Sequence, residues 1–294
     1  MPLKIGVDFD NTIISYRKLF HELAVAQGWV PPQPALSKEQ VKSVLLKQDG
    51  NDLRWQSLQA KAYGPEILRA APFEGFREFV SSAALQGHEI VIVSQKSVAS
   101  HYDPSVRLRE WALRWCAEQK ITGIAPGNIF FEATREEKVA RISALKLDLF
   151  VDDLPEVLEH PEFPASTTAV WFTQAEPTAK LPGYPICVSW HEVLRFVEVA
   201  GQVSAEAAAA VYRTTGWLPT QSRQLKGGNN QIHCTTQKNG CSVLVKRYFR
   251  HDSSERDRCK AEFGALQLLW KNGIRNIAEP LYCDPASRFA LHAF

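Results

Sequence analysis

The sequence predicts an α/β fold with a doubly wound parallel sheet, and three observations carry that prediction. Short apolar runs recur along the first 200 residues without polar alternation, which is typical of strands buried on both faces. Segments with helical spacing separate the runs, so that strand and helix alternate. Carboxylates or hydroxyls stand where three of the runs end, and ligands of such sheets bind at the carboxyl ends of strands.

The composition is that of an ordinary globular protein. Its 294 residues are 45% hydrophobic and 22% charged, enough for one large domain or two ordinary ones. The six cysteines form no C-x-x-C pair and have no histidine at finger spacing, so we expect neither a zinc site nor a disulfide framework. No signal segment is evident, and no apolar run approaches the roughly 20 residues that span a bilayer. We therefore expect a cytoplasmic protein with no membrane partner.

The net charge of +2 hides an asymmetry between the two ends of the chain. Residues 201–294 hold 13 Lys/Arg against 7 Asp/Glu, a net charge of +6, whereas residues 1–200 carry −4. This difference predicts two units with different surfaces. A basic face of this size suits anionic small molecules or is simply solvated, and we expect no nucleic-acid partner.

The first predicted strand, 4–7, brings Asp8 and Asp10 to its carboxyl end. Residues 15–72 follow with helical spacing and several breakers, and no strong strand is expected among them. We interpret this segment as a small helical insertion beside the site; an ordinary pair of connecting helices is the alternative. The expected helices cover 16–27, a stretch beginning at 37 with a capping signal, and the region of 55–63.

From residue 76 onward, helices and strands alternate regularly. Ser94 ends one strand, Asp152 and Asp153 end another, and Lys138 lies near the start of the helix between them. A capping box at 134–137 opens that helix. The expected strands are 89–93, 128–131, 148–151, 168–173 and 186–189, and the expected helices are 76–86, 106–119, one from 134, and 190–199.

These polar residues suit phosphoryl transfer. A phosphate ester repels a carboxylate nucleophile until cations neutralise its charge. Asp8 can serve as the nucleophile and form an aspartyl-phosphate. Asp10 can act as general acid toward the leaving group and then as base toward water. Ser94 can hydrogen-bond a phosphoryl oxygen, and Lys138 can hold both the phosphate and the Asp8 carboxylate.

Mg²⁺ prefers oxygen ligands, usually carboxylates, a carbonyl and water. Asp153, with Asp152 beside it, completes a metal site that Asp8 and Asp10 begin. Lys96 follows the strand that ends at Ser94, and two interpretations of this lysine stay open. In the first it adds a cation to the phosphate pocket, and in the second it is a solvated loop lysine.

The residues at these strand ends resemble, in order, the four motifs of the haloacid dehalogenase-like (HAD) superfamily. Asp8-Phe9-Asp10-Asn11-Thr12 resembles the first motif, although Asn11 stands where glycine is commoner. Residues 90–94 resemble the second motif and Lys138 the third. Residues 150–153 resemble the fourth motif in the form that has two adjacent acids. The resemblance covers roughly 1–200. It implies that the backbone carbonyl of Asp10 also binds Mg²⁺, and that the helical insertion is a cap that selects the substrate. We therefore expect a Mg²⁺-dependent phosphatase acting on a small phosphorylated metabolite.

The basic C-terminal part carries a second phosphate-binding pattern. Residues 201–223 contain an alanine-rich helix, and we expect this segment to link the C-terminal part to the first domain. In 224–294, Gly227 and Gly228 precede a strand, Lys246 lies in the next strand, and Glu262 lies in a helix expected over 255–270. This order suits a nucleotide-phosphate cradle in which Glu262 pairs with Lys246. A plain β-hairpin with a surface lysine is the alternative.

The same pattern resembles the N-terminal lobe of aminoglycoside-phosphotransferase-like kinases, an α+β unit. The resemblance implies that the glycine turn covers ATP, that Lys246 holds its phosphates and that Glu262 orients Lys246. No His-x-Asp catalytic loop or metal-binding Asp follows before Phe294, so we expect a partial, truncated lobe without kinase activity; whether it belongs to a longer fusion stays open. Two alternatives to a working phosphatase stay open. The first domain is catalytically idle and the chain is a nucleotide-binding module, or the chain is half of a phosphatase–kinase fusion acting on one metabolite.

Overall fold

The computed structural model describes residues 1–48 in full, the backbone of 49, and residues 52–121, 123–174, 183–226, 229–237, 240–249 and 257–293. The chain forms two compact units, Lys4–Thr167 and a second that comprises Met1–Leu3 with Thr168–Phe294. The domain boundaries predicted at 200 and 224 rest on motif content and stay a prediction. Within the described residues, no helix has the length and apolarity needed to cross a membrane.

A parallel sheet forms the centre of the Lys4–Thr167 unit. Its strands are β1 (Lys4–Val7), β4 (Glu89–Gln95), β5 (Ile129–Glu132) and β6 (Leu149–Asp152), in the order β5-β4-β1-β6. All three neighbouring pairs are parallel. Most side chains of β1, β4 and β6 are buried, as expected for apolar strands covered on both faces. The predicted α/β class is confirmed.

The strand order reverses next to β1. The chain runs from β1 to β4 to β5, and β6 then pairs with the opposite edge of β1. Because such crossovers are right-handed, the helices before β4 and β5 cover one face and the helix before β6 covers the other. These helices are α4 (Phe76–Leu85), α5 (Leu108–Glu118) and α6 (Arg135–Leu145). The reversal opens a crevice at the carboxyl ends of β1 and β6, where ligands bind in doubly wound sheets.

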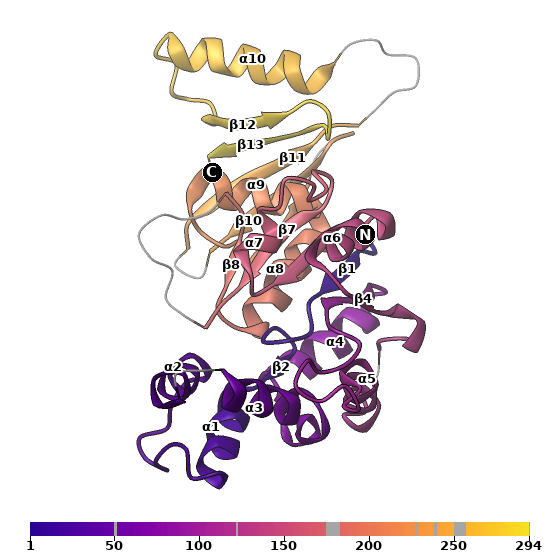
Figure 1. Cartoon of the computed structure of the whole chain (residues 1–294). Coiled ribbons are helices and arrows are strands. Elements are labelled where there is room, and N and C mark those ends of the chain that lie inside the picture. The colour runs from indigo at the N-terminus through magenta and orange to yellow at the C-terminus, as the bar shows by residue number, and fades with distance from the viewer. Residues whose placement is uncertain are drawn as a thin grey trace. The chain divides into compact units, whose positions relative to one another are not determined.

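The helical insertion, residues 15–72, leaves and re-enters this unit through a short antiparallel pair, β2 (Ile14–Ser15) and β3 (Ala71–Pro72). Sequence reasoning expected no strong strand here, and the structure adds only this two-residue pairing. The insertion contains α1 (Arg17–Ala26), α2 (Lys38–Asp49) and α3 (Leu53–Tyr63) (Figure 1). The 3-10 helix η1 (Pro65–Arg69) follows them. The ring of Phe20 in α1 stacks on Trp55 in α3, with centroids 5.1 Å apart. The remaining short elements of the unit are η2 (Pro126–Asn128) and α7 (Pro155–Leu158).

The second unit begins with a parallel strand pair and two long helices. These elements are β7 (Thr168–Phe172), β8 (Ile186–Cys187), α8 (Trp190–Val203) and α9 (Ala205–Thr215). Ser204 separates the two helices, and its side chain accepts the backbone N–H of Ala207 to begin α9. The segment 201–223, predicted as a linker, therefore contains the whole of α9.

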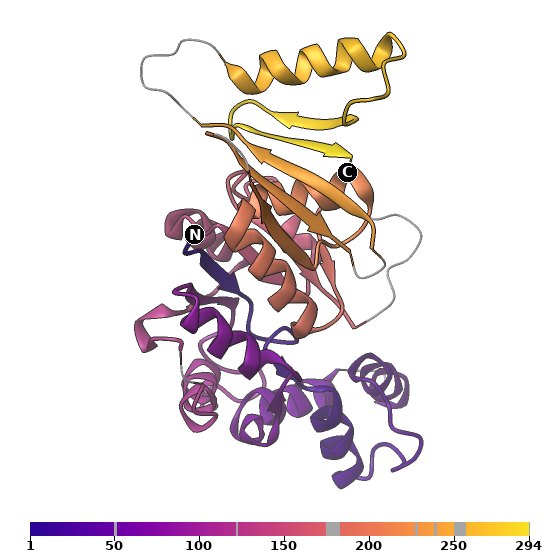
Figure 2. The same ribbon diagram turned by 180° about the vertical axis from the view of Figure 1, so that it is seen from behind.

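An antiparallel sheet with one helix completes the second unit. Its strands are β9 (Gln221–Leu225), β10 (Gln231–Thr236), β11 (Ser242–Arg247), β12 (Pro280–Asp284) and β13 (Phe289–Ala293), in the order β9-β10-β11-β13-β12. The helix α10 (Arg258–Lys271) lies along β12, as both views show (Figures 1 and 2). The β10–β11 pairing and the helix agree with the sequence prediction. The polar strand β9 and the pair β12–β13 were not predicted.

Candidate active site

Lys138 lies between two carboxylates at the reversal point of the parallel sheet. Its Nζ donates to Asp8 Oδ1 at 2.6 Å and lies 2.6 Å from Asp152 Oδ2. The lysine side chain is only 2% exposed, and that of Asp152 is fully buried. Burial alone would lower the pKa of Lys138, but the carboxylates of Asp152 and Asp8 raise it above its ordinary value. Lys138 is therefore a buried cation, and it makes the contact with the Asp8 carboxylate that the sequence predicted.

The start of α6 sets the position of this lysine. Thr134 Oγ1 accepts the backbone N–H of Glu137 at 3.2 Å, and Glu137 Oε2 accepts that of Thr134 at 3.4 Å. This reciprocal capping box fixes the first turn of the helix, and Lys138 follows directly after it. The capping signal predicted from the sequence is confirmed.

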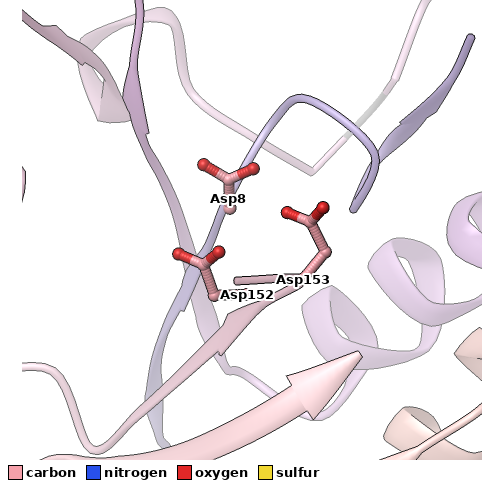
Figure 3. A group of neighbouring side chains, drawn as sticks. All are labelled: Asp8, Asp152 and Asp153. Atoms are coloured by element: carbon pink, nitrogen blue, oxygen red, sulfur yellow. The ribbon is translucent and has the colours of Figure 1, made fainter. Parts of the chain in front are cut away.

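Three carboxyl groups gather beside Lys138. Asp8 follows β1, Asp152 ends β6 and Asp153 comes next, and each contributes an oxygen to a group whose atoms all lie within 4.8 Å of one another (Figure 3). The backbone N–H of Asp8 donates to Val151 O at 2.9 Å, which ties the end of β1 to β6. The sequence placed these acids at two strand ends, and the strand order makes those ends neighbours.

Crowding of the acids shifts their titration. Burial, followed by the nearby charge of Asp8, raises the pKa of Asp152 from 3.8 to about 6 despite its contact with Lys138. Burial, Asp8 and Asp152 raise the pKa of Asp153 from 3.8 to about 8. Three carboxyl groups thus share one ammonium, and the site favours additional positive charge. Carboxylate oxygens held this closely match the ligand preference of Mg²⁺.

Asp10 has partners of its own. Tyr16 donates its hydroxyl to Asp10 Oδ1 at 2.6 Å, and Lys96 Nζ lies 3.0 Å from Oδ1 and 2.7 Å from Oδ2. Burial and the charge of Asp10 raise the pKa of Tyr16 well above its ordinary value, so the phenol stays a donor. Asp10 is therefore held in one orientation by two groups.

Lys96 is the residue beside Asp10 whose role sequence reasoning left undecided. Its side chain is 4% exposed, and Nζ lies 5.4 Å from the ring centroid of Phe9 and 5.2 Å from that of Tyr63. Its backbone N–H donates to Glu132 O at 2.8 Å, and its carbonyl accepts Arg109 Nε at 2.8 Å. The solvated-loop interpretation is wrong. Proximity to Ser94 was the available signal, but spacing alone does not fix the direction of a side chain outside a strand.

Ser94 lies at the same edge of the sheet as Asp8. Val7 pairs with Ile92, so Ser94 stands two residues further along β4 toward the carboxyl ends, and its side chain is buried. Thr12, in the first motif, donates its hydroxyl to Asp153 Oδ1 at 3.4 Å. The described residues of one unit thus include every side chain assigned to the phosphatase site.

Two of the predicted nucleotide-binding residues, Lys246 and Glu262, are described in the second unit. Lys246 of β11 forms an ion pair with Glu262 of α10, as the sequence predicted. Its Nζ also lies 5.0 Å from the ring centroid of Tyr248. Gly227 and Gly228 lie outside the described residues.

No family model matches the chain, and no curated protein matches it. Among solved structures, it is similar to a HAD-superfamily hydrolase of Ehrlichia chaffeensis, with 12% identity and a TM-score of 0.40 over 68% of this chain and 98% of that chain. A HAD family hydrolase of Deinococcus radiodurans with bound phosphate and sodium gives 11% identity and a TM-score of 0.44 over 68% and 96%. A HAD-superfamily hydrolase of Geobacter sulfurreducens gives 14% identity and a TM-score of 0.40 over 66% and 95%.

Proposed function

We propose that the Lys4–Thr167 unit is a Mg²⁺-dependent phosphatase of the HAD-like type, which hydrolyses small phosphomonoesters through Asp8. The observation that carries this proposal is the buried Lys138, in contact with both Asp8 and Asp152 at 2.6 Å. Burying a lysine together with two carboxyl groups, with a third partly buried beside them, has a high free-energy cost, and phosphate chemistry needs this combination of groups. The order of the motifs along the sequence supports the same assignment.

Asp8, Asp152 and Asp153 would hold the Mg²⁺, together with the backbone carbonyl of Asp10. The three side chains fit the ion because they offer closely spaced oxygen atoms and an excess of negative charge. When bound, Mg²⁺ supplies positive charge that offsets the repulsion between a phosphate group and Asp8.

In the first half of the reaction, a carboxylate oxygen of Asp8 forms a bond to phosphorus while the ester P–O bond breaks. Lys138 binds Asp8 Oδ1, and Oδ2 accepts no hydrogen bond from another described residue. The free oxygen is therefore the one assigned to the attack. Asp10, in the protonated form that the second half of the reaction regenerates, gives its proton to the leaving oxygen, and Ser94 donates to a phosphoryl oxygen.

In the second half, water attacks the phosphorus of the aspartyl-phosphate and passes a proton to Asp10. The bond between Asp8 and phosphorus breaks, which releases phosphate and restores both aspartates. Lys96 and Tyr16 keep Asp10 beside the reacting oxygen in both halves, since both bind its carboxyl group.

A screen of phosphorylated metabolites tests the proposal directly. The full chain is incubated with each compound in Mg²⁺ and, in parallel, in EDTA, and released phosphate is measured. We expect turnover of at least one phosphomonoester that stops in EDTA and returns when Mg²⁺ is restored. Absence of phosphate release across a broad panel, aryl phosphates included, would reject the phosphatase in favour of a catalytically idle domain.

A second candidate function concerns the second unit. We propose that its antiparallel sheet and α10 form a nucleotide-binding lobe of the aminoglycoside-phosphotransferase type. The pairing of Lys246 with Glu262 favours it, because this contact orients a lysine toward nucleotide phosphates in kinase-like lobes. Calorimetry with ATP tests it, and binding lost in Lys246→Ala is the expected result. No heat of binding to the unaltered chain would remove this candidate.

A further inference from the structure

A cavity of about 740 Å³ lies beside Asp10 and Lys96 in the Lys4–Thr167 unit. Its far wall is built by the insertion, chiefly by α3, and Asp8, Asp152 and Asp153 are not among its lining residues. A phosphate seated at the carboxylates would therefore direct the rest of its substrate past Asp10 into this cavity. The volume falls in the usual range for ligand pockets, roughly 300–1,000 Å³, so the chemistry of the wall must indicate the occupant.

Neutral hydrogen-bonding groups line much of the cavity. The side chains of Gln59, Gln95 and Ser97 make no hydrogen bond to another described residue, although each can donate and accept. Gln56 also lines it, and its amide donates to Asp52 Oδ2 at 2.7 Å. Such groups pair well with hydroxyls, and a site that hydrogen-bonds a substrate hydroxyl discriminates strongly against compounds that lack it.

The charges on the wall nearly balance. Lys96 is already paired with Asp10, and both of these side chains face the cavity. Beyond them, the formally charged residues of the lining are one lysine, Lys42, and one acid, Asp52. The wall therefore favours an uncharged leaving group over one that carries a further phosphate or carboxylate.

Two of the aromatic rings on the wall, those of Trp55 and Tyr63, are poorly placed to stack on a base. Trp55 is 6% exposed and already stacks on Phe20, at an interplanar angle of 28°. Two ammonium groups lie over the ring of Tyr63, that of Lys38 at 5.5 Å and that of Lys96 at 5.2 Å from its centroid. Trp55 and Tyr63 therefore have partners, whereas Tyr102, which also lines the cavity, is 49% exposed and leaves one open ring, so a comparison with a nucleotide must be part of the test.

We propose that this cavity selects phosphomonoesters of uncharged polyhydroxy compounds, namely sugar or polyol phosphates, through Gln59, Gln95 and Ser97. This inference rests on the proposed phosphatase activity and adds the class of its leaving group. Hydroxyls of the substrate take up the donors and acceptors that have no partner within the chain. These side chains are partly buried or exposed, so the hydrogen bonds that they form with substrate hydroxyls favour such substrates over compounds that lack hydroxyls.

The test compares kcat/KM for ribose 5-phosphate, glucose 6-phosphate, sorbitol 6-phosphate, adenosine 5′-monophosphate and p-nitrophenyl phosphate. Ribose 5-phosphate and adenosine 5′-monophosphate form a matched pair that differs by the base. We expect the best sugar or polyol phosphate to exceed adenosine 5′-monophosphate by at least about tenfold. A preference for the nucleotide, with p-nitrophenyl phosphate also turned over, overturns the inference and leaves the phosphatase standing. No turnover of any compound overturns both.

Variants sharpen the comparison. Gln59→Leu keeps the size of the side chain and removes its hydrogen-bonding groups. We expect it to lower kcat/KM for the best sugar phosphate about tenfold more than for p-nitrophenyl phosphate, and Ser97→Ala to act in the same direction. Lys18→Met, an exposed change on α1, is the control and should leave the ratio unaltered. Equal losses for both substrates in a folded Gln59→Leu protein would contradict the assignment.

Discussion

The ammonium group of Lys96 lies 2.7 Å from Asp10 Oδ2 and 3.0 Å from Oδ1, in a partly buried contact between the segment after β4 and the first motif. Tyr16 adds a hydrogen bond from the start of the insertion. The proposed proton carrier is therefore held by the parallel-sheet core and by the insertion together. This relationship gives Lys96 a positioning role for Asp10 in addition to its charge.

Lys96→Met should impair turnover according to the leaving group. Without its lysine partner, Asp10 is poorly placed to protonate an alkoxide, and this proton transfer contributes about 10²–10⁴-fold. An alkyl phosphate should lose about 10²-fold in kcat, whereas p-nitrophenyl phosphate, whose leaving group needs little protonation, should lose much less. Steady-state kinetics on both substrates measure the difference. Lys96→Arg should recover part of the loss, and an equal loss for both substrates would indicate a purely structural lysine.

Lys138→Met should destabilise the metal-free protein. Removing this lysine leaves Asp8 and Asp152 buried without their cation, and breaking a buried ion pair costs about 3–5 kcal/mol. Urea unfolding of the variant and the parent gives the change in free energy. Lys18→Met, at an exposed position, should stay within about 0.5 kcal/mol. A similar small change for Lys138→Met would show that the buried contact contributes little.

The stability of the metal-free protein should fall as pH rises from about 4 to about 8. Burial and neighbouring carboxylates raise the pKa of Asp152 to about 6 and that of Asp153 to about 8, both above the ordinary 3.8. In that window the folded state retains protons that the unfolded chain has released, so the free energy of unfolding decreases with pH. Mg²⁺ replaces those protons, and it should stabilise the protein more at pH 8 than at pH 5.5.

Chemical unfolding at several pH values, with and without Mg²⁺, checks this dependence. Asp153→Asn is the matched variant, because it removes the group with the higher pKa and keeps the side-chain shape. Its stability should vary less between pH 6 and pH 8 than that of the parent. An unchanged slope in Asp153→Asn would mean that other groups cause the dependence.

Glu262→Gln should weaken binding of ATP to the second unit. The amide cannot form the ion pair that orients Lys246, and a tenfold loss in affinity corresponds to about 1.4 kcal/mol. Calorimetry on the full chain measures this change. Lys260→Gln, an exposed change on the same helix, is the control. If Glu262→Gln and the control bound ATP with equal affinity, the ion pair between Lys246 and Glu262 would have no role in nucleotide binding.

The grouping of Asp8, Asp152 and Asp153 was predictable because it follows from topology. Apolar runs identify buried strands, and parallel strands bring the residues after them to one edge. Lys138 was predictable for a related reason, since a capping box fixed the start of its helix. These positions depend on backbone geometry, which the sequence pattern specifies.

The partners of Asp10 were harder to predict. Lys96 comes just after a strand, where the backbone no longer alternates, and its burial depends on Phe9 and Tyr63 from distant segments. The sequence pattern identified Tyr16 only as the start of a helix. Likewise, β9 (Gln-Ser-Arg-Gln-Leu) has no apolar pattern, and its strand geometry depends on pairing with β10. Long-range packing decides such cases.

The central claim is that Asp8 accepts the phosphoryl group, and turnover by Asp8→Asn tests it most directly. The amide is a far weaker nucleophile of nearly the same shape, so we expect kcat to fall by at least about 10³-fold with the fold retained by circular dichroism. The protein must be freshly purified and its mass checked, because deamidation would restore Asp8. A pure, folded Asp8→Asn protein that keeps turnover within tenfold of the parent would contradict the assignment of Asp8 as the nucleophile.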